Sequence, residues 1–197
     1  MASHIILNEL DLAFDLDLVD TDQGTTSNGA QYKNINQNGY VPTLELDDGR
    51  LLTENNAILQ YLGDLQAAGV LIPPSDSFER IRLQELLGFL SSELHKAYSP
   101  FFSGKTLNVE EEKSMKDQLF KRIDFIEGHL KGSGDFLMGK DYTVVDAYAF
   151  VVLNWSNFIG ISLDRWPTIV GFMQRVSSRP AVRDAMVAEG IIESGES

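Results

Sequence analysis

The chain has 197 residues, of which 43% are hydrophobic and 10% aromatic, so it can bury a substantial core and is too apolar to be disordered. Its formal charge of -13 at pH 7 would repel nucleic acid and anionic membrane surfaces, and we expect neither as a partner. The absence of cysteine excludes disulfides, thiolate metal sites and cysteine nucleophiles. The sequence has no run of about 18 apolar residues and no signal-peptide pattern, so we expect a cytoplasmic protein.

The first thirty residues predict a helix, a strand and a loop. Ser3 is a suitable N-cap for a short apolar helix. Phe14, Leu16 and Leu18 alternate with aspartates, which predicts a half-buried strand. The stretch 21–31 is polar and contains glycine, which is typical of a loop or of one weak helical turn.

Residues 40–64 are the most informative stretch of the chain. The dipeptide Val41-Pro42 opens an apolar alternation; X-Pro bonds are the common site of cis peptides, and proline suits the start of a strand. The dipeptide Asp48-Gly49 predicts a hairpin turn. A helix then begins near positions 53–55, because apolar residues recur at helical spacing: Ala57, Ile58, Tyr61, Leu62 and Leu65.

The rest of the chain predicts a linker and then helices. Residues 66–77 include two consecutive prolines, which cannot continue a helix. Amphipathic patterns over 78–102 and 110–131 predict two long helices. Thr143 and Asp146 have the spacing of a capping box, for which we expect a structural role. Proline in a first turn predicts two shorter helices, beginning at Trp166-Pro167 and Arg179-Pro180.

A strand-initial proline, a hairpin and a helix with an acid and an amide at its start resemble the glutathione-binding half of a glutathione transferase. The resemblance to the bacterial beta class continues through Ser3-His4-Ile5, Glu93-Leu94-His95-Lys96 and the run from Tyr142 to Tyr148. It implies an α/β plus all-α protein, with a thioredoxin-like domain over 1–65 and a helical-bundle domain over 78–197. It also implies a homodimer with a role in detoxification.

Relative to that family, the chain opens directly on the first helix. We therefore expect a thioredoxin-like domain without its first strand and catalytic turn, about ten residues by ordinary element lengths. In the family that turn carries the Tyr, Ser or Cys that addresses the glutathione sulfur, and Ser3 aligns beyond it. A mis-assigned start codon, a shortened chain and a true loss remain open.

The resemblance assigns glutathione to two segments of the first domain. The backbone of Val41, between Tyr40 and a cis Pro42, would hold the cysteinyl part. Glu54 and Asn55 would hold the γ-glutamyl end, since a helix N-terminus favours the carboxylate and Glu54 can accept from the ammonium. Plain helix capping and an ordinary strand-start proline are the alternatives.

The resemblance places His95 on the helix that lines the electrophile cleft. There a neutral imidazole would hydrogen-bond the thiol or a water, and Lys96 would favour a thiolate. Ser92 and Glu93 would reach glutathione held by the other subunit. A structural histidine is the alternative. The other two histidines have no partner at ligand spacing, so we expect no metal.

The main hypothesis is an enzyme that conjugates its co-substrate glutathione to small hydrophobic electrophiles. Six aromatic residues would form cleft walls or, alternatively, core: Phe89, Tyr98, Phe101, Phe102, Trp155 and Phe158. A non-catalytic glutathione-binding or structural dimer is the second hypothesis, because Gly24 and Gly88 stand where relatives use Lys and Asn. A third is an interaction module whose exposed strand edges recruit a partner.

Overall fold

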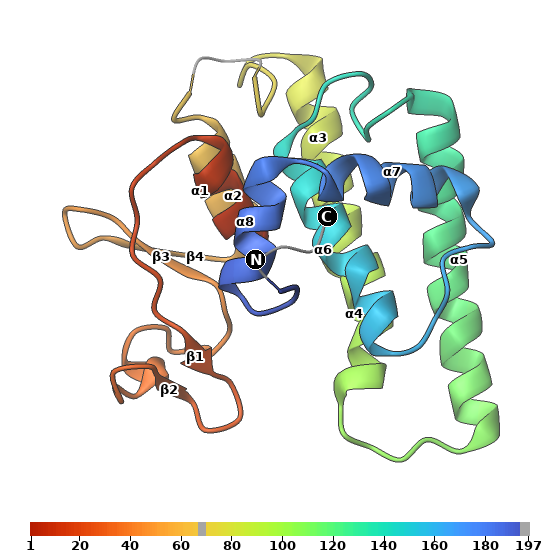
Figure 1. Cartoon of the computed structure of the whole chain (residues 1–197), viewed down its shortest axis with the longest axis horizontal. Coiled ribbons are helices and arrows are strands. Elements are labelled where there is room, and N and C mark those ends of the chain that lie inside the picture. The colour runs from red at the N-terminus through yellow and green to blue at the C-terminus, as the bar shows by residue number, and fades with distance from the viewer. Residues whose placement is uncertain (67–69, 194–197) are drawn as a thin grey trace.

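The computed structural model describes residues 1–66 and 70–193, and a small α/β unit comes first in the chain (Figure 1). Its elements are α1 (Ala2–Glu9), β1 (Val19–Asp20), β2 (Thr25–Thr26), the 3-10 turn η1 (Tyr32–Asn34), β3 (Thr43–Glu45), β4 (Leu51–Thr53) and α2 (Asn55–Gly63). The strands form two antiparallel pairs, β1 with β2 and β3 with β4.

The hairpin predicted around Asp48-Gly49 is confirmed. Gly49 has φ +80°, a conformation that glycine adopts without strain, and the two flanking strands pair in register. Thr43 of β3 lies opposite Thr53 of β4. The residues just outside this pair, Pro42 and Glu54, therefore emerge at the same end of the hairpin.

Two predictions for the N-terminal segment are wrong. Ser3 lies inside the first turn of α1, whose N-cap position is Met1. The strand predicted from Phe14 to Leu18 does not form, and Leu16 and Leu18 are 49% and 62% exposed. A strand needs a neighbour for its backbone groups, and among the described residues no strand pairs with this segment. The alternating sequence pattern is present, but among the described residues no neighbouring strand pairs with it.

The second part of the chain is helical, as predicted. Its elements are α3 (Phe78–Phe89), the π-helical segment η2 (Leu90–Leu94), α4 (His95–Tyr98), the 3-10 turn η3 (Ser99–Phe102), α5 (Val109–Ser133), α6 (Val144–Phe158), α7 (Pro167–Ser177) and α8 (Pro180–Ala188). Both prolines begin their helices as expected. The helix predicted over 78–102 is continuous in its course, but its periodicity did not reveal the π segment in its middle.

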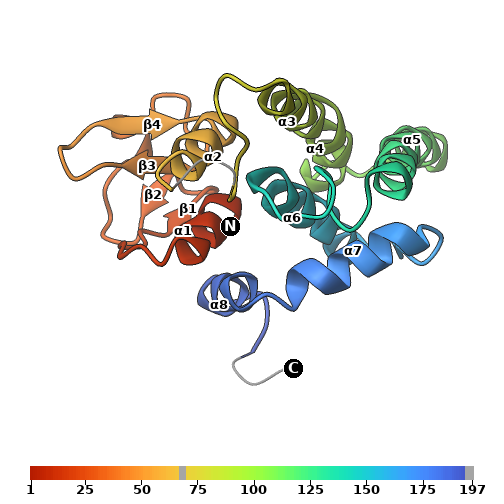
Figure 2. The same cartoon turned by 90° about the horizontal axis from the view of Figure 1, so that it is seen from above.

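Helix α6 lies at the centre of one shared core. Nearly all of its residues are buried, and it packs against α1, α2, α3 and α7. Figure 2 shows α1 and α2 between the β3–β4 hairpin and the helical part, with α8 beside α1. Of the predicted linker, positions 67–69 lie outside the described residues, while Leu71 and Ile72 are buried. Among the helices of the described ranges, each is too short or too polar to traverse a bilayer.

The structural role expected for Asp146 is confirmed. Its Oδ2 accepts from the backbone N–H and the hydroxyl of Thr143, at 2.8 and 2.9 Å. Its Oδ1 accepts from the backbone N–H of Leu137, at 2.8 Å, which also ties the preceding loop to α6. Complete burial raises the pKa of Asp146 to about 6, although these hydrogen bonds oppose the rise.

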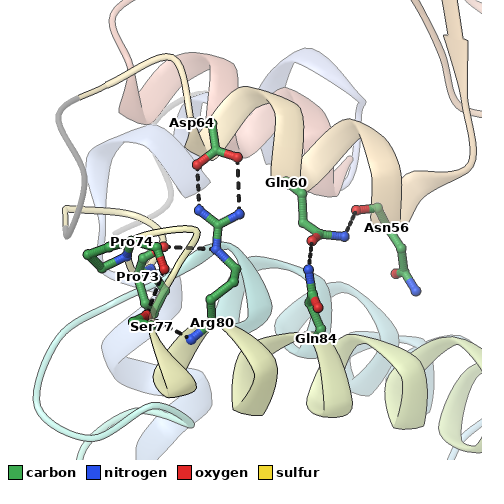
Figure 3. Close-up of polar contacts among 8 residues, drawn as sticks. All are labelled: Asn56, Gln60, Asp64, Pro73, Pro74, Ser77, Arg80 and Gln84. Atoms are coloured by element: carbon green, nitrogen blue, oxygen red, sulfur yellow. Dashed lines mark hydrogen bonds and ion pairs between the residues drawn. The ribbon is translucent and has the colours of Figure 1, made fainter.

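A polar ladder joins α2 to α3 (Figure 3). Asn56, Gln60 and Asp64 are spaced four residues apart, so they share one face of α2. Asp64 accepts two hydrogen bonds from the Arg80 guanidinium, and the side-chain Oε1 of Gln60 accepts from Gln84 Nε2 at 2.7 Å. The ladder holds α2 at a fixed position against the helical part.

Replacing Asp64 with alanine is expected to lower the free energy of unfolding by about 1–2 kcal/mol, measured by urea denaturation. Arg80 is 5% exposed, and among the described residues its side chain would keep only the Pro73 carbonyl as a hydrogen-bond partner. Because the Asp64 side chain is 48% exposed, solvent limits the loss. Asp48→Ala is the control, since Asp48 pairs with Arg50 at an exposed site and should cost less than about 0.5 kcal/mol. Equal losses in the two variants would contradict the ladder's role.

Candidate functional site

The loop that enters β3 is exposed but firmly held. The Val41-Pro42 peptide is cis, as expected, and Tyr40 and Val41 are 75% and 51% exposed. The Tyr40 carbonyl accepts from the Tyr32 hydroxyl at 3.0 Å and from Asn36 Nδ2 at 2.7 Å. Sequence reasoning missed both supports, which carry no recognisable motif. Among the described residues the Val41 backbone has no hydrogen-bond partner, so its N–H and C=O are available to a ligand.

Glu54 precedes α2 in a strained conformation. Its φ of +67° and ψ of 111° lie in a region that residues other than glycine rarely adopt. It stands at the N-cap position, but its side chain makes no capping hydrogen bond. Plain capping therefore does not explain this residue, and backbone strain of this kind is typical of functional sites.

The first turn of α2 offers unused donors. Asn55 Nδ2 is buried and has no partner among the described residues, and a buried unpaired donor is costly. The backbone N–H groups of a helical first turn are also unpaired and carry positive potential. An anionic acceptor would suit this end of the helix. Asn56, which sequence reasoning also missed, donates to the Leu87 carbonyl at 3.1 Å and to Ser91 Oγ at 3.0 Å, so α2 begins against the π segment.

Three of the predicted polar residues lie in or next to the π segment, and they differ in whether their side chains already have a partner. The Ser92 hydroxyl donates to the Gly88 carbonyl at 2.8 Å. Glu93 forms an ion pair with Arg122 of α5, at 2.8 Å. Lys96 is exposed and has no ion pair among the described residues. Of these three side chains, Lys96 is thus the one without a partner among the described residues.

His95 follows the π segment and contacts α6. Its Nδ1 lies 3.0 Å from the Tyr148 hydroxyl, and its ring meets Trp155 edge-on with centroids 4.6 Å apart. Burial, and secondly the charge of Lys96, lower the pKa of His95, which favours the neutral ring at pH 7. Sequence reasoning missed Tyr148 as a site residue, since nothing in the sequence relates positions 95 and 148.

Tyr148 also connects His95 to the start of α2. Burial, and secondly the nearby charge of Glu54, raise the pKa of Tyr148 to about 12. The Glu54 carboxylate is therefore within electrostatic reach of the hydroxyl that contacts His95. Together with the hydrogen bonds from Asn56 to Leu87 and Ser91, this puts the start of α2 near the π segment and His95.

Four of the six predicted cleft aromatics divide into three groups, while Phe101 is partly buried against the core and Phe158 is 60% exposed. Trp155 packs edge-on against His95 and Phe102, and these rings form an aromatic wall beside the predicted site. Tyr98 is fully buried and bonds Ser156 at 2.6 Å, so it belongs to the core. Phe89 stacks on Phe125 of α5, with centroids 4.3 Å apart. The core alternative therefore holds for Tyr98.

A cavity of about 540 Å³ lies elsewhere, between the end of α6, α7 and Met186 of α8. None of the predicted site residues lines it. In residues 1–66 and 70–193, no three acidic or histidine side chains are grouped as metal ligands would be.

Both parts of the chain match models of known protein domains. Residues 2–65 match the model of the glutathione S-transferase N-terminal domain, and residues 89–180 match that of the C-terminal domain. The chain belongs to the glutathione S-transferase family. It therefore has the fold that the resemblance implied, a small thioredoxin-like N-terminal domain followed by a helical domain.

Individual glutathione S-transferases resemble the chain over nearly its whole length. Glutathione S-transferase GstA of Escherichia coli O157:H7 is 39% identical, over 97% of this chain and 94% of that protein. The beta-class glutathione S-transferase of Sphingomonas chungbukensis is 34% identical with a TM-score of 0.91. A sphingomonad glutathione S-transferase solved in complex with glutathione is 34% identical with a TM-score of 0.90. Both structural matches cover 97% of this chain and 94% of the other. The chain is thus a transferase-like enzyme of this family.

Proposed function

We propose that this transferase binds glutathione across the Tyr40–Pro42 loop and the start of α2. The observation that carries the proposal is the buried Nδ2 of Asn55, which has no partner in residues 1–66 and 70–193, beside the strained Glu54. The γ-glutamyl carboxylate would accept from Asn55 and the helix N-terminus, while the Glu54 carboxylate would accept from the ammonium. The unpaired Val41 backbone would bind the cysteinyl part. The sphingomonad relative that holds glutathione supports this ligand.

The proposed reaction conjugates glutathione to small hydrophobic electrophiles. A thiol with a free pKa of about 8.5 must ionise near pH 7 beside an apolar surface. The chain has no cysteine, so the groups that would stabilise the thiolate are His95, by hydrogen bonding, and Lys96, by charge. Phe102 and Trp155 would hold the electrophile. No step requires a metal, and we propose that the protein works in the cytoplasm, in detoxification.

We further propose a homodimer whose subunits meet through α3 and α5. Exposed apolar side chains on these helices support it: Phe78 is 65%, Ile81 53% and Phe125 49% exposed. Such an arrangement would let Ser92 and Glu93 reach glutathione in the other subunit. The two domains of each subunit would span 1–65 and 78–197.

The test is a calorimetric titration of the chain with reduced glutathione. We expect saturable binding at micromolar to millimolar concentration, weakened about tenfold in Asn55→Ala because a charge-assisted hydrogen bond is lost. Asn157→Ala, an exposed asparagine at the end of α6, is the matched control and should bind as the wild type does. A folded chain without saturable binding would contradict the proposal.

A turnover assay distinguishes the conjugating enzyme from a non-catalytic glutathione-binding dimer. The absence of cysteine favours the non-catalytic dimer. Chloronitrobenzene-type acceptors are the substrates for this assay. Binding without turnover would support the dimer. The absence of both would favour an interaction module.

A further inference from the structure

The contact between His95 and Tyr148 allows two proton arrangements. His95 Nδ1 and the Tyr148 hydroxyl lie 3.0 Å apart, and Tyr148 is 6% exposed. In one arrangement the hydroxyl donates to Nδ1, and the neutral ring carries its proton on Nε2. In the other, Nδ1–H donates to the hydroxyl oxygen, and Nε2 is a bare acceptor.

Counting hydrogen-bond donors and acceptors distinguishes the two proton arrangements. Within residues 1–66 and 70–193, the Tyr148 hydroxyl has no hydrogen-bond partner other than His95. If the ring donated, the hydroxyl proton of this 6%-exposed tyrosine would have no acceptor among the described residues, which is costly in a buried side chain. If the hydroxyl donates, both atoms of the pair are satisfied. The remaining Nε2–H then belongs to a partly exposed ring, where water or a ligand can accept from it.

Packing holds the ring in this orientation. Trp155 meets the His95 ring edge-on, with centroids 4.6 Å apart and planes at 85°. Trp155 is itself packed against Tyr98, whose hydroxyl is fixed to Ser156. A half-turn of the imidazole would move Nδ1 away from the Tyr148 hydroxyl and forfeit the hydrogen bond.

We propose that Tyr148 is a positioning residue that holds His95 as the neutral tautomer protonated at Nε2. His95 then presents a donor of fixed identity at the site, which suits an anionic acceptor better than a protonated thiol, whose sulfur accepts only weakly. That this acceptor is the glutathione sulfur rests on the proposed function, whereas the tautomer itself does not.

The tautomer can be read directly by long-range ¹H–¹⁵N correlation spectra of ¹⁵N-histidine protein at pH 8. The chain has three histidines, and the His95→Gln variant identifies the signals of His95. We expect an Nε2–H pattern for His95 in the wild type. In Tyr148→Phe the ratio of the tautomers should shift toward Nδ1–H about fivefold, as loss of one hydrogen bond implies. Signals of His4 and His129 should not move.

Tyr98→Phe is the matched control, because it removes another buried hydroxyl that bonds Ser156 and not His95. It should leave the His95 tautomer unchanged. An Nδ1–H pattern in the wild type would overturn the proposal, even if Tyr148→Phe fails to fold. A folded Tyr148→Phe with the wild-type pattern would overturn it as well.

Adding reduced glutathione to the same samples tests the link to function. A shift of the His95 Nε2 signal in the wild type, smaller in Tyr148→Phe because less of the Nε2–H tautomer is present, is the expected result. A wild-type Nε2–H pattern that glutathione leaves unmoved would sustain the tautomer and contradict the sulfur as its acceptor. Calorimetry on the same sample shows whether glutathione binding itself has failed.

Discussion

Replacing Asp146 with alanine is expected to lower the free energy of unfolding by about 3 kcal/mol at pH 7. The carboxylate is completely buried and accepts hydrogen bonds from Thr143 and from the Leu137 backbone. Alanine would leave these donors buried without an acceptor and would remove the carboxylate half of the capping box that begins α6, the central helix of the core. Chemical denaturation of both proteins provides the measurement.

Glu111 is the matched control for Asp146. It occupies the same capping-box position, three residues after Asn108 at the start of α5, but it is exposed. Glu111→Ala should cost only about 0.5–1 kcal/mol. A loss as large as that of Asp146→Ala would show that burial of the carboxylate does not determine how much unfolding free energy is lost.

The stability difference between wild type and Asp146→Ala is also expected to depend on pH. Because burial raises the pKa of Asp146 to about 6 from an ordinary value of 3.8, the folded state holds this proton more tightly than the unfolded chain. Stability from this group is therefore greatest below the unfolded pKa and declines as pH rises through the folded one. The difference should shrink between about pH 4 and pH 6 and stay constant above. A difference that grows over this window would contradict the raised pKa.

Replacing Glu54 with glycine is expected to act in opposite directions on stability and binding. Glycine adopts φ +67° and ψ 111° without a Cβ clash, so relief of strain should raise the free energy of unfolding by about 1 kcal/mol. Loss of the carboxylate should weaken glutathione binding at least about tenfold, since it removes the proposed partner of the ammonium. Denaturation and calorimetry on one preparation measure both effects.

Glu45→Gly is the control, because Glu45 is an exposed residue in the ordinary strand β3. There glycine should destabilise by about 0.5–1 kcal/mol and leave glutathione binding unchanged. If Glu54→Gly were as destabilising as Glu45→Gly, the unusual backbone conformation of Glu54 would not reduce the free energy of unfolding of the wild type. If it bound glutathione as tightly as the wild type, Glu54 would have no part in the site.

Much of the architecture could be predicted from the sequence, because its signals are local. The Asp48-Gly49 turn, the prolines that begin α7 and α8, and the Thr143–Asp146 cap each depend on residues a few positions apart. The same holds for the start of α2 at Asn55 and for the placement of a cis bond before Pro42. Short-range geometry and hydrogen bonding are sufficient to specify such features.

Tertiary structure alone decided the features that depend on distant partners. The alternation from Phe14 to Leu18 predicts a strand, yet none forms, because a strand is stabilised by a neighbour that its own residues do not specify. Likewise, the contact of His95 with Tyr148 joins residues 53 positions apart, and it exists only because α4 packs beside α6. Amino-acid sequence therefore determined most helices, the hairpin and the family of this protein, whereas packing determined which strands form, which side chains face His95 and which backbone groups remain open to a ligand.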